Sequence, residues 1–430
     1  MSEEEYALIH ALMTVNEDMR VIVVGDDDQN IFEFRGSDSR FMSQLLEKPG
    51  ARFIEMTENY RSAKHVVDFA NAFVKGIPGR IKHSPIVSMN HKEGFVYIRH
   101  HVSHLMYQPL VEDLLAHKGN GTICVLTQTN EEAAILVALL RKNGLRSKLV
   151  QSMDGFRFWN MAEVRMFLKQ INSENYSPII SENAWEEAKQ KTFAMYANSS
   201  SLPYLQRCLL LFEKTNKAKY HTDLKEFIFE SSIEDFCDLS GADVVVSTIH
   251  KAKGREFDDV FMLITNPQRV INETLRRYYV GATRAKERLF IHTNSFLFDK
   301  MPADEHLVCT TEYDMPDEIV LQLSHRDVNL GFFKMRKKEI LALRAGQTLR
   351  FDNNYFYDCS TDKVVAQLSQ KMQGEMRFWS ERGYTVDSSS IRFVVAWRPK
   401  DAPKDEKEHA VLLIDLVLKK GECNGIRFGD

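Results

Sequence analysis

The stretch GTICVLTQTNEEAAILVALLRKNGLRSKLV, residues 121–150, decides the fold class. It opens with the apolar run ICVL, which is typical of a buried strand. The segment EEAAILVALLRK continues with apolar residues at helical spacing, and SKLV ends the stretch as a second strand. A strand, a helix and a strand in this order are the repeating unit of a parallel α/β sheet. The stretch therefore predicts an α/β domain built on a parallel sheet.

The same alternation extends along the chain on both sides of this stretch. FVYIRHHV at 95–102 predicts a strand followed by a helix, and the pattern returns at 242–264 and 274–293. Between the two parts, residues 161–235 are mostly helical and polar, which predicts a helical insertion at 153–240 within one α/β domain. The tail is richer in short strands around a helix near 361–382, which predicts a small α+β or β-rich domain.

The first residues of the chain have the pattern of an incomplete domain. Residues 3–14 carry helical spacing, and the unbroken apolar run VIVV at 21–24 predicts a strand buried on both faces of a parallel sheet. Residues 51–56 predict a further strand. Because a parallel strand needs neighbours, we expect the earlier strands of this domain to lie upstream of Met1 or in another chain.

The composition indicates a soluble globular protein of several domains. The 430 residues are 44% hydrophobic and 27% charged, and such a chain is too long for one ordinary core. A net charge of −4 gives no global basic field, although a local basic groove stays open as an alternative. The six scattered cysteines form no Cys-x-x-Cys and are interpreted as reduced thiols. With no signal peptide and no long apolar run, we expect a cytoplasmic protein without a membrane span.

Four segments together resemble one protein family. In chain order they are GDDDQNIFEFRGS at 25–37, ENYRS at 58–62, STIHKAKGREFDDV at 247–260 and YYVGATRAKERL at 278–289. They resemble the third to sixth motifs of the UvrD/Rep/PcrA-type superfamily 1 helicases, in the family's order. The insertion between the fourth and fifth lies where that family carries a helical subdomain. The resemblance covers roughly residues 1–295.

The resemblance implies two RecA-like domains that clamp ATP between them and move along single-stranded nucleic acid. It divides the chain into five segments. They are a remnant of the first RecA-like domain (1–50), the first part of the second (51–152), the helical insertion (153–240), the second part of the second domain (241–300) and a C-terminal accessory domain (301–430).

On the nucleotide side, the resemblance implies three catalytic residues. Gln29 follows an apolar run, and its amide can both donate to a phosphate oxygen and accept from the attacking water, so it would sense the γ-phosphate. Arg61 and Arg284 would be arginine fingers, because a guanidinium has a fixed charge and a fork that matches phosphate oxygens. The cofactor-binding residues implied are Tyr60, which would face the adenine, Gly254 and Glu256. Taken alone, each also fits a structural role, such as a turn glutamine or an exposed arginine.

On the nucleic-acid side, the resemblance implies Phe34, Arg35, His250 and Lys253. An aromatic face stacks a base without regard to sequence, worth about 1–3 kcal/mol per base. The family often has tryptophan where this chain has Phe34. The alternatives are a core phenylalanine, a surface ion pair and a structural histidine. The acidic triplet 26–28 is interpreted as a solvated turn, and no metal ligand is predicted.

The sequence contains no G-x-x-x-x-G-K-[ST] phosphate loop and no Asp-Glu-x-x-Asp motif. We therefore expect part of an ATP-dependent DNA helicase or translocase that is not ATPase-competent alone. ATP and Mg²⁺ would be cofactors of the complete protein and would not bind tightly to this chain by itself. Single-stranded DNA or DNA junctions are the expected partners, together with the missing N-terminal half, in the same or a separate polypeptide. The alternative is a non-enzymatic, helicase-derived nucleic-acid-binding or docking module.

Overall fold

The structure is a computed structural model. It describes residues 2–16, 18–31, 36–119, 121–150, 153, 155–171, 177–266, 269–398 and 408–421. The chain forms two compact units, the first made of Met1–Leu149 with Gly241–Met315 and the second of Val150–Ser240 with Pro316–Asp430. Within the described ranges, no helix is both long and apolar enough to cross a membrane.

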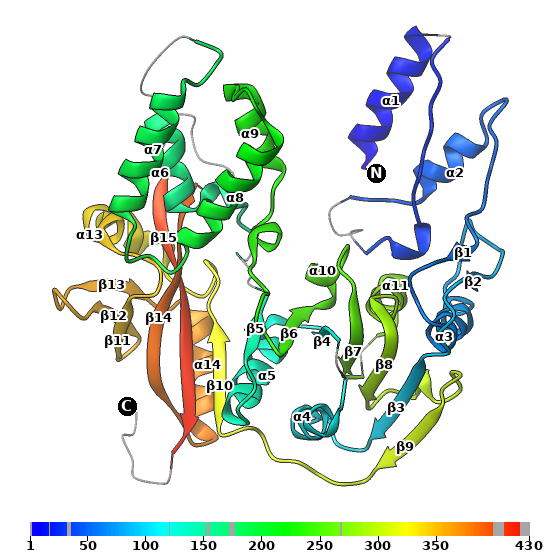
Figure 1. Cartoon of the computed structure of the whole chain (residues 1–430). Helices are drawn as coiled ribbons and strands as arrows, with labels where there is room; N and C mark the ends of the chain where they lie inside the picture. The colour runs from blue at the N-terminus through cyan, green and yellow to red at the C-terminus, as the bar shows by residue number, and fades with distance from the viewer. Residues whose placement is uncertain are drawn as a thin grey trace. The chain divides into compact units, whose positions relative to one another are not determined.

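The first unit is built on a seven-stranded sheet in which every pair of neighbours is parallel (Figure 1). The strand order is β5-β6-β4-β7-β8-β3-β9. The strands are β3 (Phe95–His101), β4 (Ile123–Thr127), β5 (Ser147–Leu149), β6 (Val244–Thr248), β7 (Phe257–Ile264), β8 (Ala285–Thr293) and β9 (Glu305–Cys309). The central strands are buried almost throughout, because helices cover both faces of the sheet.

Four helices of this unit form two pairs on opposite faces of the sheet (Figure 1): α4 packs with α5, and α3 packs with α11. The four are α3 (Lys64–Val74), α4 (Tyr107–Ala116), α5 (Asn130–Lys142) and α11 (Asn272–Ala282). Helix α5 begins where the sequence predicts it, because the Thr129 side chain accepts from the Glu132 amide in a capping box. The predicted fold class, a RecA-like parallel sheet with a helical insertion and a β-rich C-terminal domain, is confirmed.

The N-terminal segment differs from the prediction in two places. Helix α1 (Glu3–Val15) forms as expected, but residues 21–24 and 51–56 are not strands. Ile22 and Ile54 are 89% and 81% exposed. The apolar runs have the composition of strands, yet no described segment pairs with them, and a strand forms only against a neighbour. The remaining elements here are η1 (Asp27–Gln29), α2 (Arg40–Leu46) and the short parallel pair β1 (Glu58–Asn59) and β2 (Val87–Ser88).

The second unit combines the helical segment with the tail. Its helices are α6 (Ala162–Ile171), α7 (Glu182–Met195), α8 (Leu202–Thr215), α9 (His221–Glu230), α12 (Leu330–Met335), α13 (Lys337–Ala342) and α14 (Gln370–Glu381), with η3 (Phe158–Asn160) and η4 (Ile233–Phe236). A bridge between Met161 and Val395 and an ion pair between Arg165 and Glu408 join the helical segment to the sheet of the tail.

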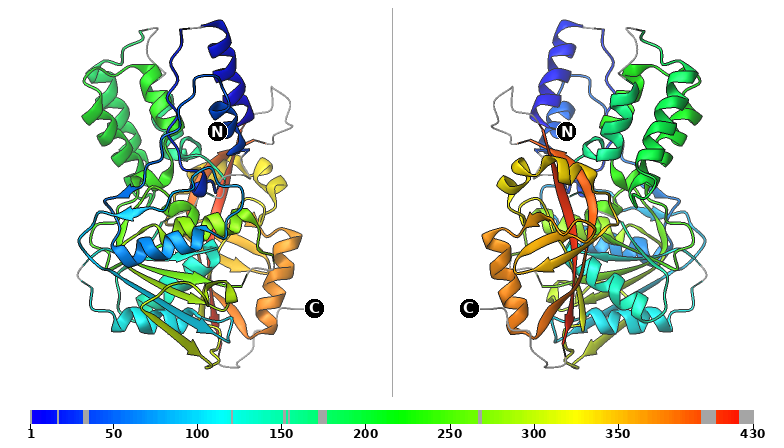
Figure 2. Two further views of the ribbon diagram at one scale, coloured as in Figure 1. Left: turned by 90° about the vertical axis from the view of Figure 1, so that its right-hand side faces the viewer. Right: turned by 90° about the vertical axis from the view of Figure 1, so that its left-hand side faces the viewer.

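The sheet of this unit is antiparallel with the order β10-β15-β14-β11-β12-β13. Its strands are β10 (Glu318–Gln322), β11 (Thr348–Asp352), β12 (Tyr355–Asp358), β13 (Val364–Gln367), β14 (Tyr384–Trp397) and β15 (His409–Lys420). Figure 2 shows α14 lying along this sheet, where it contacts β14. The helix predicted near 361–382 begins only at Gln370, because Val364–Gln367 form a strand and the Ser369 side chain caps the helix.

Candidate nucleotide and nucleic-acid site

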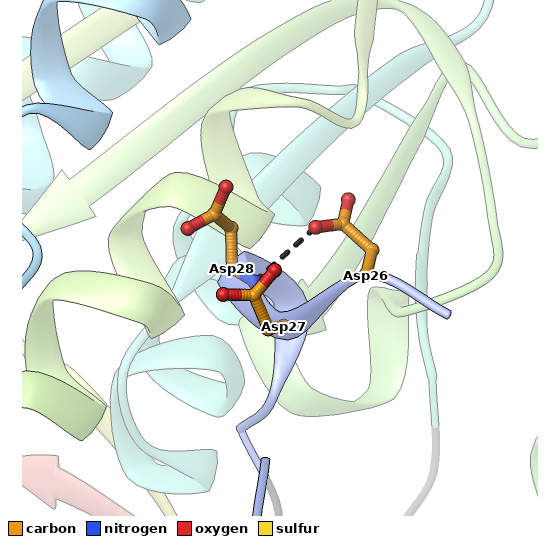
Figure 3. Close-up of side chains that lie close together, drawn as sticks. All are labelled: Asp26, Asp27 and Asp28. Atoms are coloured by element: carbon orange, nitrogen blue, oxygen red, sulfur yellow. Dashed lines mark hydrogen bonds between the residues drawn. The ribbon is translucent and has the colours of Figure 1, made fainter. Parts of the chain in front are cut away.

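The acidic triplet Asp26–Asp28 forms a tight turn that is mostly buried (Figure 3). The Asp28 amide donates to the Asp26 carboxylate, and Asp28 itself is 0% exposed in a two-pronged ion pair with Arg80, at 2.7 and 2.8 Å. The Ile81 amide donates to Asp27 at 2.7 Å, and burial raises the Asp27 pKa. The interpretation as a solvated turn is therefore wrong for Asp27 and Asp28, because Arg80 and Ile81 cover them.

Both polar atoms of the Gln29 side-chain amide are hydrogen-bonded. Its Nε2 donates to Asp26 at 2.7 Å, and its Oε1 accepts from Arg284 Nη2 at 3.3 Å. The Gln29 carbonyl accepts from Lys253 Nζ at 2.9 Å. Two residues expected on opposite sides, Arg284 for nucleotide and Lys253 for nucleic acid, thus meet at one glutamine.

Arg284 lies in the turn immediately before β8 and is 3% exposed. Its Nε donates to the Val280 carbonyl at 3.0 Å, and its Nη1 donates to the Arg255 carbonyl at 3.3 Å. Burial, with the nearby charge of Arg61, lowers the Arg284 pKa to about 10. The guanidinium is therefore charged at neutral pH and held in place by backbone carbonyls, with one terminal nitrogen directed at Gln29.

The turn after β1 places Arg61 beside Arg284. Asn59 Oδ1 accepts from the Arg61 and Ser62 amides at 2.9 and 2.8 Å, and the Ser62 hydroxyl donates to the Ala285 carbonyl at 2.9 Å. This bond ties the turn to the residue that follows Arg284. Arg61 Nη2 lies 2.6 Å from Glu256 Oε1.

Tyr60 faces outward from the same turn. It is 72% exposed, and its hydroxyl donates to the Glu58 carboxylate. An exposed ring is available for stacking against a planar group.

The segment that resembles the fifth motif, residues 247–260, begins within β6, whose five residues are all buried. His250 lies on the short helix α10 (Ile249–Ala252). Gly254, two residues after the end of this helix, has φ +85°, a conformation that favours glycine. Burial and the charge of Arg284 lower the Lys253 pKa. Lys253 is thus placed toward the Gln29–Arg284 pair.

The structure brings together Gln29, Arg61, Lys253, Glu256 and Arg284. Phe34 and Arg35 lie outside the described residues. Sequence reasoning missed Arg80, Asp26 as the orienting partner of Gln29, and Asn59. No motif marked Arg80, whereas Asn59, next to Tyr60 and Arg61, carried a recognisable turn signal.

The three aspartates Asp26, Asp27 and Asp28 also form a candidate metal-binding cluster among the residues that the structure describes. Their carboxylate oxygens lie within 4.8 Å of one another. Each already accepts from a protein donor: Gln29, Ile81 and Arg80 respectively. These bonds explain the cluster as a support for the turn.

Comparison with known proteins places this chain in a family. The family described as "UvrD-like helicase C-terminal domain" matches residues 54–182 and 169–295, and "UvrD/REP helicase N-terminal domain" matches residues 1–49. The ATP-dependent DNA helicase PcrA of Staphylococcus epidermidis RP62A is 23% identical over 175 residues, which is 40% of this chain and 23% of that protein. PcrA of Staphylococcus aureus Mu50 gives the same figures.

The match therefore spans less than a quarter of the length of these relatives. The crystal structure of the C-terminal domain of a possible DNA helicase from Lactobacillus plantarum WCFS1 is 13% identical and covers 58% of this chain and 98% of its own, with a TM-score of 0.29. The match to the C-terminal helicase family extends over more than half of the chain and contains three of the four sequence motifs. The chain belongs to the UvrD-like helicase family.

Proposed function

We propose that this chain is part of an ATP-dependent DNA helicase or translocase and supplies the arginine side of its nucleotide site. The observation that carries the proposal is the cluster in which Gln29, Arg284 and Lys253 meet, with Arg61 tied alongside through Ser62. These residues come from four separate motifs. The hydrogen bonds of this cluster connect Gln29, in the segment that resembles the third motif, directly to residues of the second RecA-like domain.

The donors in this cluster suit the terminal phosphate of a nucleoside triphosphate. Arg61, Arg284 and Lys253 are basic side chains, and their acceptors include Glu256 and Gln29. A phosphate oxygen is a stronger acceptor for a guanidinium than a neutral amide is. When bound, ATP with Mg²⁺ would supply the phosphoryl group, and the arginines would neutralise its charge, a contribution of about 10³–10⁵ in rate in related chemistry.

Because the sequence has no phosphate loop, we propose that residues outside this sequence hold the β-phosphate and the magnesium ion. The test is ATP hydrolysis by this chain with and without single-stranded DNA, compared with Arg284→Ala. We expect no DNA-stimulated hydrolysis from either. Robust stimulated hydrolysis that Arg284→Ala abolishes would overturn the expectation that the chain is incompetent alone.

We also propose that this chain docks onto another polypeptide, and the exposed apolar N-terminal segment favours it. Ile22, Val24, Ile54 and Met56 are exposed in extended segments, and no described strand pairs with them. Such surfaces are stabilised when another polypeptide covers them. We propose a polypeptide that carries the phosphate loop as the occupant, in the same or a separate chain.

The docking proposal is tested by co-purification with a polypeptide that contains a UvrD-type phosphate loop. Val24→Asp should abolish co-purification, whereas Ile179→Asp, at another exposed apolar position, should leave it unchanged. Co-purification that survives Val24→Asp, or that both substitutions abolish equally, would exclude this surface.

A further inference from the structure

Strand β9 leaves one side of the seven-stranded sheet open. It pairs with β3 on one side, and within the described ranges no strand pairs with its other side. The Val102 amide donates to the Cys309 carbonyl at 3.0 Å, so the backbone of Cys309 faces β3. Because backbone direction alternates along a strand, His306 and Val308 direct their amides and carbonyls to the open edge. These groups can pair with an added strand.

Two exposed apolar side chains, Val308 and Phe296, lie on or near this edge strand. Val308 is 73% exposed and is in register with His100, whose ring stacks on Phe296 at 5.0 Å between centroids. Phe296 itself is 77% exposed. Edge strands are usually protected by lysine or proline, and β9, with the sequence EHLVC, has neither. The edge is therefore chemically suited to strand addition.

The surroundings of the edge are acidic. Between residues 299 and 314 the sequence has five carboxylates and one lysine, with no arginine. The five carboxylates belong to exposed residues, which are Asp299, Asp304, Glu305, Glu312 and Asp314. This charge disfavours nucleic-acid phosphates. It also disfavours a second copy of β9, which would bring the same carboxylates against themselves.

We propose that β9 binds an extended segment of a partner protein, which joins the sheet as an additional strand. Its backbone pairs with His306 and Val308, its apolar side chains cover Val308 and Phe296, and basic residues flank the apolar part. Backbone pairing supplies affinity in such complexes, and the side chains supply specificity. This surface is separate from the Gln29–Arg284 cluster, so the proposal stands independently of the proposed function.

The probe is the fluorescently labelled peptide Lys-Lys-Val-Thr-Ile-Thr-Val-Lys-Lys, titrated with the full chain and followed by anisotropy. We expect saturable binding that weakens with added salt. N-methylation of the central isoleucine removes one backbone donor and should weaken binding about tenfold. Val308→Lys introduces a charge that protects the open edge of β9, and it should weaken peptide binding by at least about tenfold.

Two further variants control for folding and for non-specific contact. Val308→Ile keeps the β-branched shape and should bind like the unmodified chain. Leu210→Lys changes an exposed apolar residue of α8 and should also leave binding unchanged. Absent saturable binding, equal loss in Val308→Lys and Leu210→Lys, or insensitivity to N-methylation would overturn the proposal. Self-association through β9 that the peptide fails to inhibit would overturn it in favour of a second copy.

Discussion

Replacing Arg80 should release the turn that holds Gln29. The Asp28 carboxylate is fully buried, and Arg80, whose side chain is 15% exposed, is its ionic partner. Removing one member of a buried pair costs about 3–5 kcal/mol, because the other charge is left uncompensated. Since Arg80 keeps some contact with water, we expect Arg80→Met to cost the lower figure, about 3 kcal/mol.

Hydrogen exchange at the turn measures this cost locally, which matters because a chain of two units need not unfold in one step. The amides of Gln29, Asn30 and Ile81 all donate within or onto the turn. A loss of about 3 kcal/mol corresponds to roughly a hundredfold faster exchange if local opening controls it. Lys64→Met removes an exposed pair with Asp68 and should change exchange at these amides by less than about twofold.

A double substitution distinguishes the cost of leaving the Asp28 charge buried without a partner from the cost of losing the packing of the Arg80 side chain. In Arg80→Met with Asp28→Asn, the buried group is neutral, so exchange should recover part of the way toward that of the unmodified chain. Unchanged exchange in Arg80→Met would contradict the role of Arg80 as the ionic partner of Asp28. A double variant that opens as readily as the sum of the two single variants requires would contradict it as well.

Two further predictions concern the sheet of the first unit. In Gly94→Ala, the new Cβ would lie 2.6 Å from the Ala63 Cβ and 2.7 Å from the Glu287 carbonyl oxygen, at φ +78°. We therefore expect a local loss of at least about 3 kcal/mol, measured by hydrogen exchange at the β3 amides. Gly144→Ala, in open space at φ +82°, should cost about 1 kcal/mol at the amides of its own turn. Equal losses would contradict this. The buried histidines His101 and His292, whose ring nitrogens Nε2 and Nδ1 are hydrogen-bonded at 3.2 Å, should make unfolding pH-dependent. Burial lowers the His101 pKa to about 4 and the His292 pKa well below its usual range. The unfolded histidines bind protons near pH 6.5, so stability should be complete above that pH and fall as the pH decreases toward 4, and a melting temperature that stays constant over this interval would contradict it.

The parallel sheet was predictable because its strands and helices depend on local pattern. The apolar run of β4 and the capping box at Thr129 both belong to the segment they define. Residues 21–24 have the same composition as a buried strand and are not one here, because a strand also requires a neighbour that local sequence does not supply.

In the candidate site, too, local motifs predicted some features, whereas others depend on tertiary contacts. The motifs predicted that Gln29, Arg61 and Arg284 belong to one place, and the structure brings them into one cluster. The burial of Asp28 depends on Arg80, fifty-two positions later in a loop without a motif, so no local pattern could reveal it. The direction of Lys253 toward Gln29 likewise follows from tertiary packing.

Binding of a single-stranded oligodeoxynucleotide tests the central claim most directly. Anisotropy is measured with this chain over a series of salt concentrations. For single strands the slope of log affinity against log salt is about −0.7 per phosphate contact. Contacts from the three basic residues expected on the nucleic-acid side, Arg35, His250 and Lys253, would give a slope of roughly −2. We expect saturable binding with a slope of this order. No binding at low salt, or an affinity that does not change with salt, would contradict it.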